Sequence, residues 1–184
     1  MSWRRCFLVL VSGVMIAGLA PAAVGDSGSA RAESHCVVRV VGQTADGELL
    51  VSPAECYQTL ASALGAASGG TLTLDPDFSG AELLGDGGLG QFSLASTLGV
   101  HFDGLNGTGS SISVSGSGCT GGYWNTGAAW ANRISSSWNG CYRLRHHDSP
   151  NASGSSGDTV GVGSTHNVPS TINNKAESVS YRSS

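Results

Sequence analysis

The residues of this chain best suited to metal chemistry are histidines and aspartates in two short runs. His146, His147 and Asp148 are consecutive. In the other run, His101 lies two residues before Asp103. Imidazole and carboxylate groups are common ligands of transition metals. Both runs fall in segments that alternate as β-strands do, so neighbouring side chains are expected on opposite faces of a sheet. His146 and His147 should therefore not share one metal ion, and we expect a structural role for these residues.

No other arrangement in the sequence indicates catalysis. Asp75 and Asp77 form a carboxylate pair, but Pro76 between them is typical of a turn. No serine lies in a complete Gly-x-Ser-x-Gly sequence, and no glycine-rich phosphate loop follows a strand. The N-glycosylation sequences at Asn106 and Asn151 occupy equivalent places in two related hairpins, where turn chemistry accounts for asparagine. We therefore expect a protein without enzyme activity and without a required cofactor.

The N-terminus has the features of a secretory signal peptide over residues 1–23. Two arginines precede an apolar run at Phe7–Leu19, and small residues follow. A basic start, a short apolar stretch and a small-residue cleavage site are typical of such peptides. Cleavage after Ala22 or Ala23 suits the apolar run best, and Ala32 offers a second site. We expect a secreted protein with no membrane span after cleavage.

The cysteines predict disulfides. The chain has 5 cysteines, and Cys6 would leave with the signal peptide. An even number of cysteines in an exported chain favours disulfides over metal or redox chemistry. Four cysteines allow three pairings, and we favour Cys36–Cys56 with Cys119–Cys141, because each pair then lies within one expected structural unit.

Charge and composition exclude some classes of partner. The chain has 9 lysine and arginine residues against 13 aspartate and glutamate residues, for a formal net charge of −4. The sequence offers no basic patch for phosphate backbones, so nucleic-acid binding is not expected. The 28 glycines and the low charged fraction of 12% are typical of a turn-rich β protein.

The chain divides into five expected segments. A polar linker at 24–35 follows the signal peptide, and a small α+β cap at 36–77 follows the linker. A glycine-rich linker at 78–92 then leads to a β domain at 93–184.

Within the cap, local patterns predict three kinds of element. Cys36–Val41 is rich in β-branched residues, and Leu49–Val51 should pair back with it after an Asp-Gly turn. The capping-box sequence Ser52–Glu55 predicts a helix that continues to about Ala67. The alternation in Thr71–Leu74 predicts a further strand.

The C-terminal half contains a repeat. Phe102–Ser111 and His147–Ser156 share aspartate, asparagine, glycine and a Ser-Ser pair at matching positions. A repeat of this size usually marks a unit that packs on its own copy to bury its apolar face. The shared glycines, Gly109 and Gly154, are expected where each hairpin needs a positive φ.

These residues resemble the βγ-crystallin pattern. In each copy an aromatic or histidine residue and an aspartate lead into a hairpin that ends in glycine, and an Asn-x-x-Ser/Glu-Ser signature follows. The units would be Leu98–Asn139 and Gly140–Arg182, with signatures at 131–136 and 173–178. The resemblance implies a mainly β fold, a double Greek key sandwich of two four-stranded sheets, which here follows the disulfide-linked cap.

The resemblance also implies a calcium site between the two signatures. The matched positions supply side-chain oxygens and, at Arg133 and Lys175, backbone carbonyls. The first signature has Ala131 where asparagine or aspartate belongs, and the second has glutamate where a hydroxyl belongs. The alternative is that these residues only hydrogen-bond the turns. The candidate calcium ligands are Asn132, Arg133, Ser135, Asn174, Lys175 and Glu177.

The chain is further similar to a group of secreted bacterial proteins that includes metalloprotease inhibitors and killer-toxin-like proteins. This similarity implies a non-enzymatic binding protein, with inhibition of a secreted peptidase as the leading expectation. The Cys119–Asn139 region is the expected contact surface, and Tyr123, Trp124 and Trp130 are its candidate partner-binding residues unless they form the core. The alternatives are an antagonist that binds a cell-wall component and a calcium-binding structural protein of the cell surface.

Overall fold

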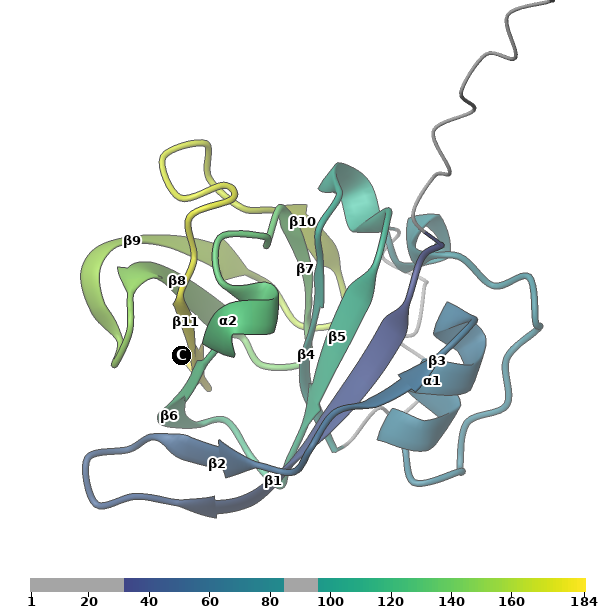
Figure 1. The fold of residues 1–184 in the computed structure, drawn as a ribbon, viewed down its shortest axis with the longest axis horizontal. Helices are drawn as coiled ribbons and strands as arrows, with labels where there is room; N and C mark the ends of the chain where they lie inside the picture. The colour runs from purple at the N-terminus through teal and green to yellow at the C-terminus, as the bar shows by residue number, and fades with distance from the viewer. Residues whose placement is uncertain (1–31, 85–95) are drawn as a thin grey trace, which may run out of the picture. The chain divides into compact units, whose positions relative to one another are not determined.

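Two β-sheets make up most of residues 32–84 and 96–184, which are the residues described by the structure, a computed structural model (Figure 1). The expected signal peptide lies outside the described residues, as do 24–31 and 85–92 of the two expected linkers. Residues Ala32–Ser184 form one compact unit. The prediction of a mainly β protein is confirmed.

The first sheet contains seven strands. All neighbouring strands in it are antiparallel except β1 and β5, which run parallel. Its main path runs in the order β10 (Thr165–Asn167), β7 (Ser136–Asn139), β4 (Thr97–Phe102), β5 (Ser111–Ser115), β1 (His35–Gln43) and β2 (Leu49–Val51), while β3 (Glu55–Tyr57) pairs with the first part of β1.

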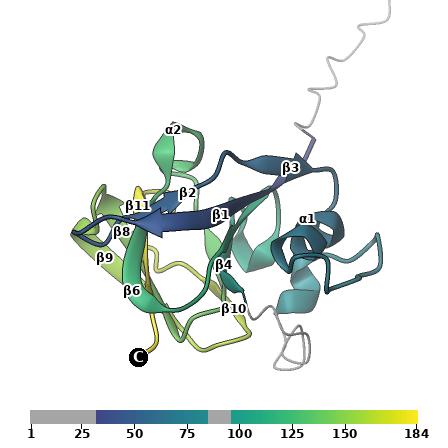
Figure 2. The same ribbon diagram turned by 90° about the horizontal axis from the view of Figure 1, so that it is seen from below.

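The second sheet contains four antiparallel strands. Their order is β6 (Thr120–Asn125), β11 (Ser178–Arg182), β8 (Arg143–Ser149) and β9 (Ser153–Val160). In both views the second sheet lies on one side of β1 and β5, and the helix α1 (Leu60–Ala67) lies on the other (Figures 1 and 2).

The two repeated units exchange strands. The strands β4, β5 and β7 of the first unit lie in the first sheet, but its third strand, β6, lies in the second sheet. The second unit shows the converse arrangement, because β8, β9 and β11 lie in the second sheet and β10 lies in the first. Neither unit therefore has a complete sheet without the other.

The first sheet is buried on both faces. Leu98 and Val114 pack in the cluster shared with the second sheet, whereas Val100 and Phe102 pack with Leu64 of α1 on the other face. As expected for strands covered on both sides, every residue of β4 and β5 is buried.

The helix expected from Ser52 begins later. Its N-cap is Thr59, whose hydroxyl accepts a hydrogen bond from the Ser62 backbone N–H at 3.2 Å. Residues Glu55–Tyr57 instead form β3, which pairs with β1 opposite Cys36. Strand pairing and the disulfide outweigh the local capping signal, because a helix from Ser52 would pull Cys56 out of register with Cys36.

The expected strand at Thr71–Leu74 is also absent from the described residues. Leu72 is buried, but its backbone N–H donates to the Ser68 hydroxyl at 3.0 Å rather than to a strand. After it comes a short 3₁₀ helix, η1 (Gly80–Leu83). The segment expected as a small α+β cap, 36–77, extends the first sheet through β1 and covers its outer face through α1.

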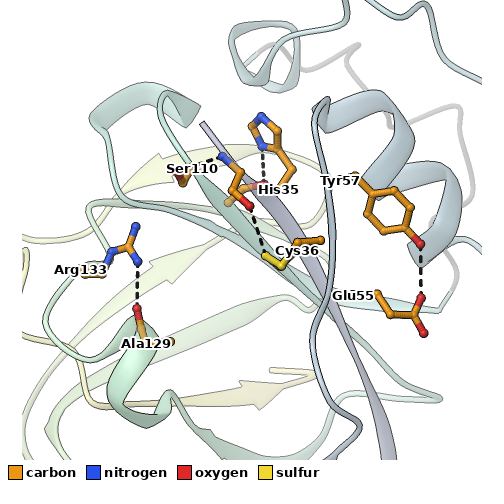
Figure 3. Close-up of a disulfide and its surroundings, with 10 residues drawn as sticks. His35, Cys36, Glu55, Tyr57, Ser110, Ala129 and Arg133 are labelled. Atoms are coloured by element: carbon orange, nitrogen blue, oxygen red, sulfur yellow. Dashed lines mark hydrogen bonds between the residues drawn. A yellow bond between two sulfur atoms is a disulfide. The ribbon is translucent and has the colours of Figure 1, made fainter. Parts of the chain in front are cut away.

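Both expected disulfides are present. Cys36 and Cys56 lie directly opposite each other on β1 and β3 and form one bond (Figure 3). The other joins Cys119, just before β6, to Cys141, just after β7. Closing a loop of this length stabilises the fold by about 3 kcal/mol in the chain-entropy treatment, because it restricts the unfolded chain.

The repeated hairpins have the same backbone conformation. Gly109 and Gly154 have φ values of +78° and +76°. A methyl group at Gly109 would collide with the carboxylate of Asp103, and one at Gly154 would collide with that of Asp148. The prediction of a positive φ at both glycines is confirmed.

We predict that Gly109→Ala and Gly154→Ala each lower the midpoint of thermal unfolding. A Cβ in the left-handed region costs about 1–2 kcal/mol, and the collision with aspartate adds to this strain.

Gly121→Ala separates the two contributions, because Gly121 has a φ of +92° but no atom lies within 4 Å of the position that an added methyl group would take. Gly42→Ala is the control, since its added methyl would meet only Leu50, at an ordinary 3.8 Å. Melting curves in which Gly109→Ala matches Gly42→Ala would contradict the hairpin geometry.

Candidate functional site

The two signature segments, 131–136 and 173–178, lie against each other and are called the crossed loops here. They exchange backbone hydrogen bonds in a twofold pattern. The Asn132 N–H donates to the Ala176 carbonyl at 2.9 Å, and the Asn174 N–H donates to the Ile134 carbonyl at 3.0 Å. Both asparagines have positive φ, +60° and +56°, a conformation that asparagine tolerates better than most residues.

The side chains of the crossed loops also pair between the two segments. The Asn132 amide donates to Glu177 Oε1 at 3.2 Å, and the Ser135 hydroxyl donates to Asn174 Oδ1 at 2.9 Å. The Ser135 hydroxyl also lies 3.3 Å from Asn173 Oδ1. The structure therefore brings together four of the sequence-predicted ligand side chains, and it adds Asn173.

The cationic side chains of the crossed loops turn away from these oxygens. The Arg133 guanidinium donates to the Ala129 carbonyl at 2.9 Å (Figure 3) and to Asp103 Oδ2 at 2.7 Å. It also lies 4.7 Å from the centre of the Trp130 ring. Lys175 Nζ donates to the Thr171 carbonyl at 3.1 Å. Neither cation is directed at the polar cluster, whose Glu177 and Asn174 oxygens accept hydrogen bonds from within the crossed loops.

The last serine of each signature has a role that sequence reasoning missed. Ser136 donates to the Gly104 carbonyl at 2.7 Å and accepts from the Gly107 N–H at 2.9 Å. In the second copy, Ser178 donates to the Ser149 carbonyl and accepts from the Ala152 N–H, at 2.7 and 3.1 Å. These serines therefore fasten each hairpin to its own unit.

A second missed pair fastens each hairpin to the other unit. Asn167 accepts from the backbone N–H of Asn106 at 2.7 Å and donates to its side chain at 2.8 Å. Asn125 makes the same two contacts with Asn151, at 2.8 and 2.9 Å. The signal in the sequence is that Asn125 and Asn167 precede the two signatures by the same number of residues.

The aromatic residues expected to bind a partner are buried. Tyr123, Trp124 and Trp130 expose 7%, 3% and 5% of their surfaces. Trp124 and Trp130 belong to the main hydrophobic core. These side chains form no exposed aromatic shelf, because the core between the sheets needs their area.

The histidines singled out in the sequence lie on opposite faces of β8. His146 is fully buried between the sheets, whereas the ring of His147 faces outward and lies 3.0 Å from the Ser180 hydroxyl. This arrangement confirms that the two rings do not share one ligand. Among the described residues no group of three or more histidine, cysteine, aspartate and glutamate side chains is placed to hold a metal ion.

His146 belongs to a buried polar network that joins the two sheets. The Ser137 hydroxyl lies 2.9 Å from His146 Nε2 and 2.8 Å from His101 Nδ1. His101 Nε2 lies 2.9 Å from the Tyr181 hydroxyl, and its ring stacks on Trp124. Burial lowers the pKa of both histidines, that of His146 to about 4, and it raises the pKa of Tyr181. A serine between two histidines could suggest catalysis, but these groups are sealed in the core.

Comparisons with known proteins found no matching family model, curated protein or solved structure. The helices of the described residues are all too short or too polar to cross a membrane.

The buried histidines predict loss of stability in mild acid. The unfolded chain takes up protons on His101 and His146 below about pH 6.5, while the folded protein keeps both rings neutral. The free energy of unfolding should therefore fall as the pH drops from 6.5 toward 4, by about 1.4 kcal/mol per pH unit for each ring. Urea unfolding at a series of pH values measures this slope.

His101→Gln should reduce the slope by the share of one ring, about 1.4 kcal/mol per pH unit, whatever its effect on stability at neutral pH. Ser117→Ala, at an exposed serine outside the polar network, should keep the slope of the original protein. A stability that is constant between pH 6.5 and 5 would show that the buried rings are already charged in the fold.

Proposed function

We propose that this protein is a secreted, non-enzymatic binding protein with a double Greek key of the βγ-crystallin type, and that its crossed loops bind calcium. The exchange of β6 and β10 between the sheets supports the Greek key assignment, because each four-strand unit sends its third strand to the other sheet. The disulfides support secretion, since such bonds persist mainly in oxidising compartments. The observation that carries the calcium proposal is the twofold pairing of the crossed loops.

The donor set of the crossed loops suits a hard cation. Calcium takes six to eight oxygen ligands from carboxylates, amides, carbonyls and water. Glu177 offers a carboxylate, Asn132 and Asn174 offer amide oxygens, and the carbonyls of Arg133 and Lys175 accept no hydrogen bond within the described residues. Only one of these groups is charged, so binding should be weak.

The bound ion would supply a positive charge shared by the two loops. Oxygens that now accept hydrogen bonds across the twofold pair would turn to the ion, and the link between the two units would strengthen. The flanking hairpins need no contact with the ion, because Ser136 and Ser178 already hold them in place. Calcium would therefore act on stability rather than on a reaction.

Calorimetric titration should detect calcium with a dissociation constant on the order of 10⁻⁴–10⁻³ M, the range of weakly charged extracellular sites. The double variant Ser135→Ala/Asn174→Ala should lose most of this binding, and Glu177→Gln should weaken it. Ser117→Ala, at an exposed serine outside the crossed loops, is the control. Tight binding that survives the double variant would place the ligands elsewhere.

Peptidase inhibition is the second candidate function, and one surface favours it. The Cys119–Cys141 bond closes the segment that holds β6, the short helix α2 (Gly127–Trp130) and β7. Within this segment Gly127–Ala129 is exposed, while Trp130 behind it is buried in the core. A small-residue surface held rigidly in this way can enter a cleft with little loss of entropy.

Assays of the mature protein against secreted metallo- and serine peptidases test the inhibitor function. Inhibition should weaken about tenfold or more in Ala128→Glu, because the added side chain and charge would be buried at the contact. Ala45→Glu, in the exposed turn between β1 and β2, is the matched control. Equal loss in both variants, or no inhibition of any peptidase, would rule out this surface as the inhibitory loop.

A further inference from the structure

Three arginines gather on the outer face of the second sheet. Arg143 on β8 and Arg182 on β11 are directly opposite each other, so their side chains share one face of the sheet. Arg145 lies two residues along β8 and therefore shares that face as well. The intervening Leu144 is fully buried and points into the core. These arginines are called the arginine face.

The arginine face holds more positive charge than its one carboxylate balances. Asp158 receives two hydrogen bonds from Arg145, at 2.7 and 2.9 Å. Its nearest approach to Arg143 is 3.7 Å from Nε, which is too long for a hydrogen bond. That Nε is buried and has no hydrogen-bond partner. Among the described residues no carboxylate forms an ion pair with the exposed Arg182.

Two other arginines, by contrast, each have a carboxylate partner within hydrogen-bond distance. Arg39 pairs with Glu55 at 3.0 Å, and Arg133 pairs with Asp103 at 2.7 Å. Like charges directly opposite on neighbouring strands are destabilising, and a buried donor without a partner carries a further cost. Burial lowers the pKa of His147 on the same face, and Arg145 and Arg182 add to this effect while Asp158 and Asp148 oppose it. An anion between Arg143 and Arg182 would relieve the repulsion between these two like charges.

We propose that the arginine face binds a phosphate group through Arg143 and Arg182, with Arg145 held in place by Asp158. Three arginines against one aspartate leave two positive charges, which match a phosphate dianion at neutral pH. Planar guanidinium groups bind phosphate oxygens with paired hydrogen bonds, and about a third of the Arg143 side chain is exposed. This site lies outside the crossed loops in sequence and shares none of their residues, so it does not depend on calcium.

Nuclear magnetic resonance titration of the full protein with inorganic phosphate, at ionic strength kept constant with chloride, tests the proposal. We expect saturable shifts of the backbone amides of β8 and β11. Arg182→Gln and Arg143→Gln should each weaken binding about tenfold, the loss expected for one charged hydrogen bond. Arg39→Gln, which removes a partly exposed arginine elsewhere, should change phosphate binding by less than about twofold.

A parallel titration with glycerol phosphate distinguishes free phosphate from a phosphate group carried on a larger molecule. Binding of either compound that is lost in Arg182→Gln supports the site, and tighter binding of the ester points to a carried group as the natural ligand. If phosphate only stabilised the protein in general, its effect would be the same in every variant. Equal affinity in Arg182→Gln, Arg39→Gln and the original protein, or shifts confined to amides outside β8 and β11, would overturn the proposal.

Discussion

The strand exchange between the two repeated units is the constraint on which the rest of the described structure depends. Neither unit can bury the inner face of its sheet until it receives β6 or β10 from the other. After each exchanged strand the chain must return to its own sheet. The two connecting segments, 126–135 and 168–177, contain most of the crossed loops, which lie against each other. The shared cluster draws core residues from both units, Trp124 and Trp130 from one and Leu144 and Tyr181 from the other. Fold and candidate calcium site therefore have one topological origin.

The core between the sheets is not purely apolar. His101, Ser137, His146 and Tyr181 form a continuous polar chain from the first sheet to the second. Buried polar groups of this kind are costly when a partner is missing, so the network favours one register of the sheets over alternatives. The network also makes the fold sensitive to acid. Protonation of either buried ring would place a charge in the core without water to solvate it.

The N-terminal region adds to this core rather than standing apart from it. Strand β1 pairs in parallel with β5, and α1 covers the face of the first sheet that the second sheet leaves open. Close packing of η1 on the first hairpin, where Gly80 meets Gly107 backbone to backbone, leaves no room for a side chain at position 107. On the outer face of the second sheet, Arg143 and Arg145 are partly exposed and Arg182 is exposed, so these side chains are accessible to solvent and ligands. One proposed binding site, the crossed loops, thus lies where the chain passes back between the sheets. The other, the arginine face, lies on the outer side of the second sheet.

The sequence alone determined the features that rest on local chemistry and on repetition. These are the β character, the disulfide pairs, the hairpin glycines, the opposite orientations of His146 and His147, and the correspondence of the two signatures. It could not place the start of α1, because the capping signal at Ser52 competes with strand pairing that brings Cys56 opposite Cys36. It could not decide that the aromatic residues are buried, or that Ser136 and Asn125 hold the hairpins. Only the tertiary structure placed Arg143 opposite Arg182. The register between β8 and β11 joins residues that are far apart in the chain, and local sequence patterns do not predict such a pairing.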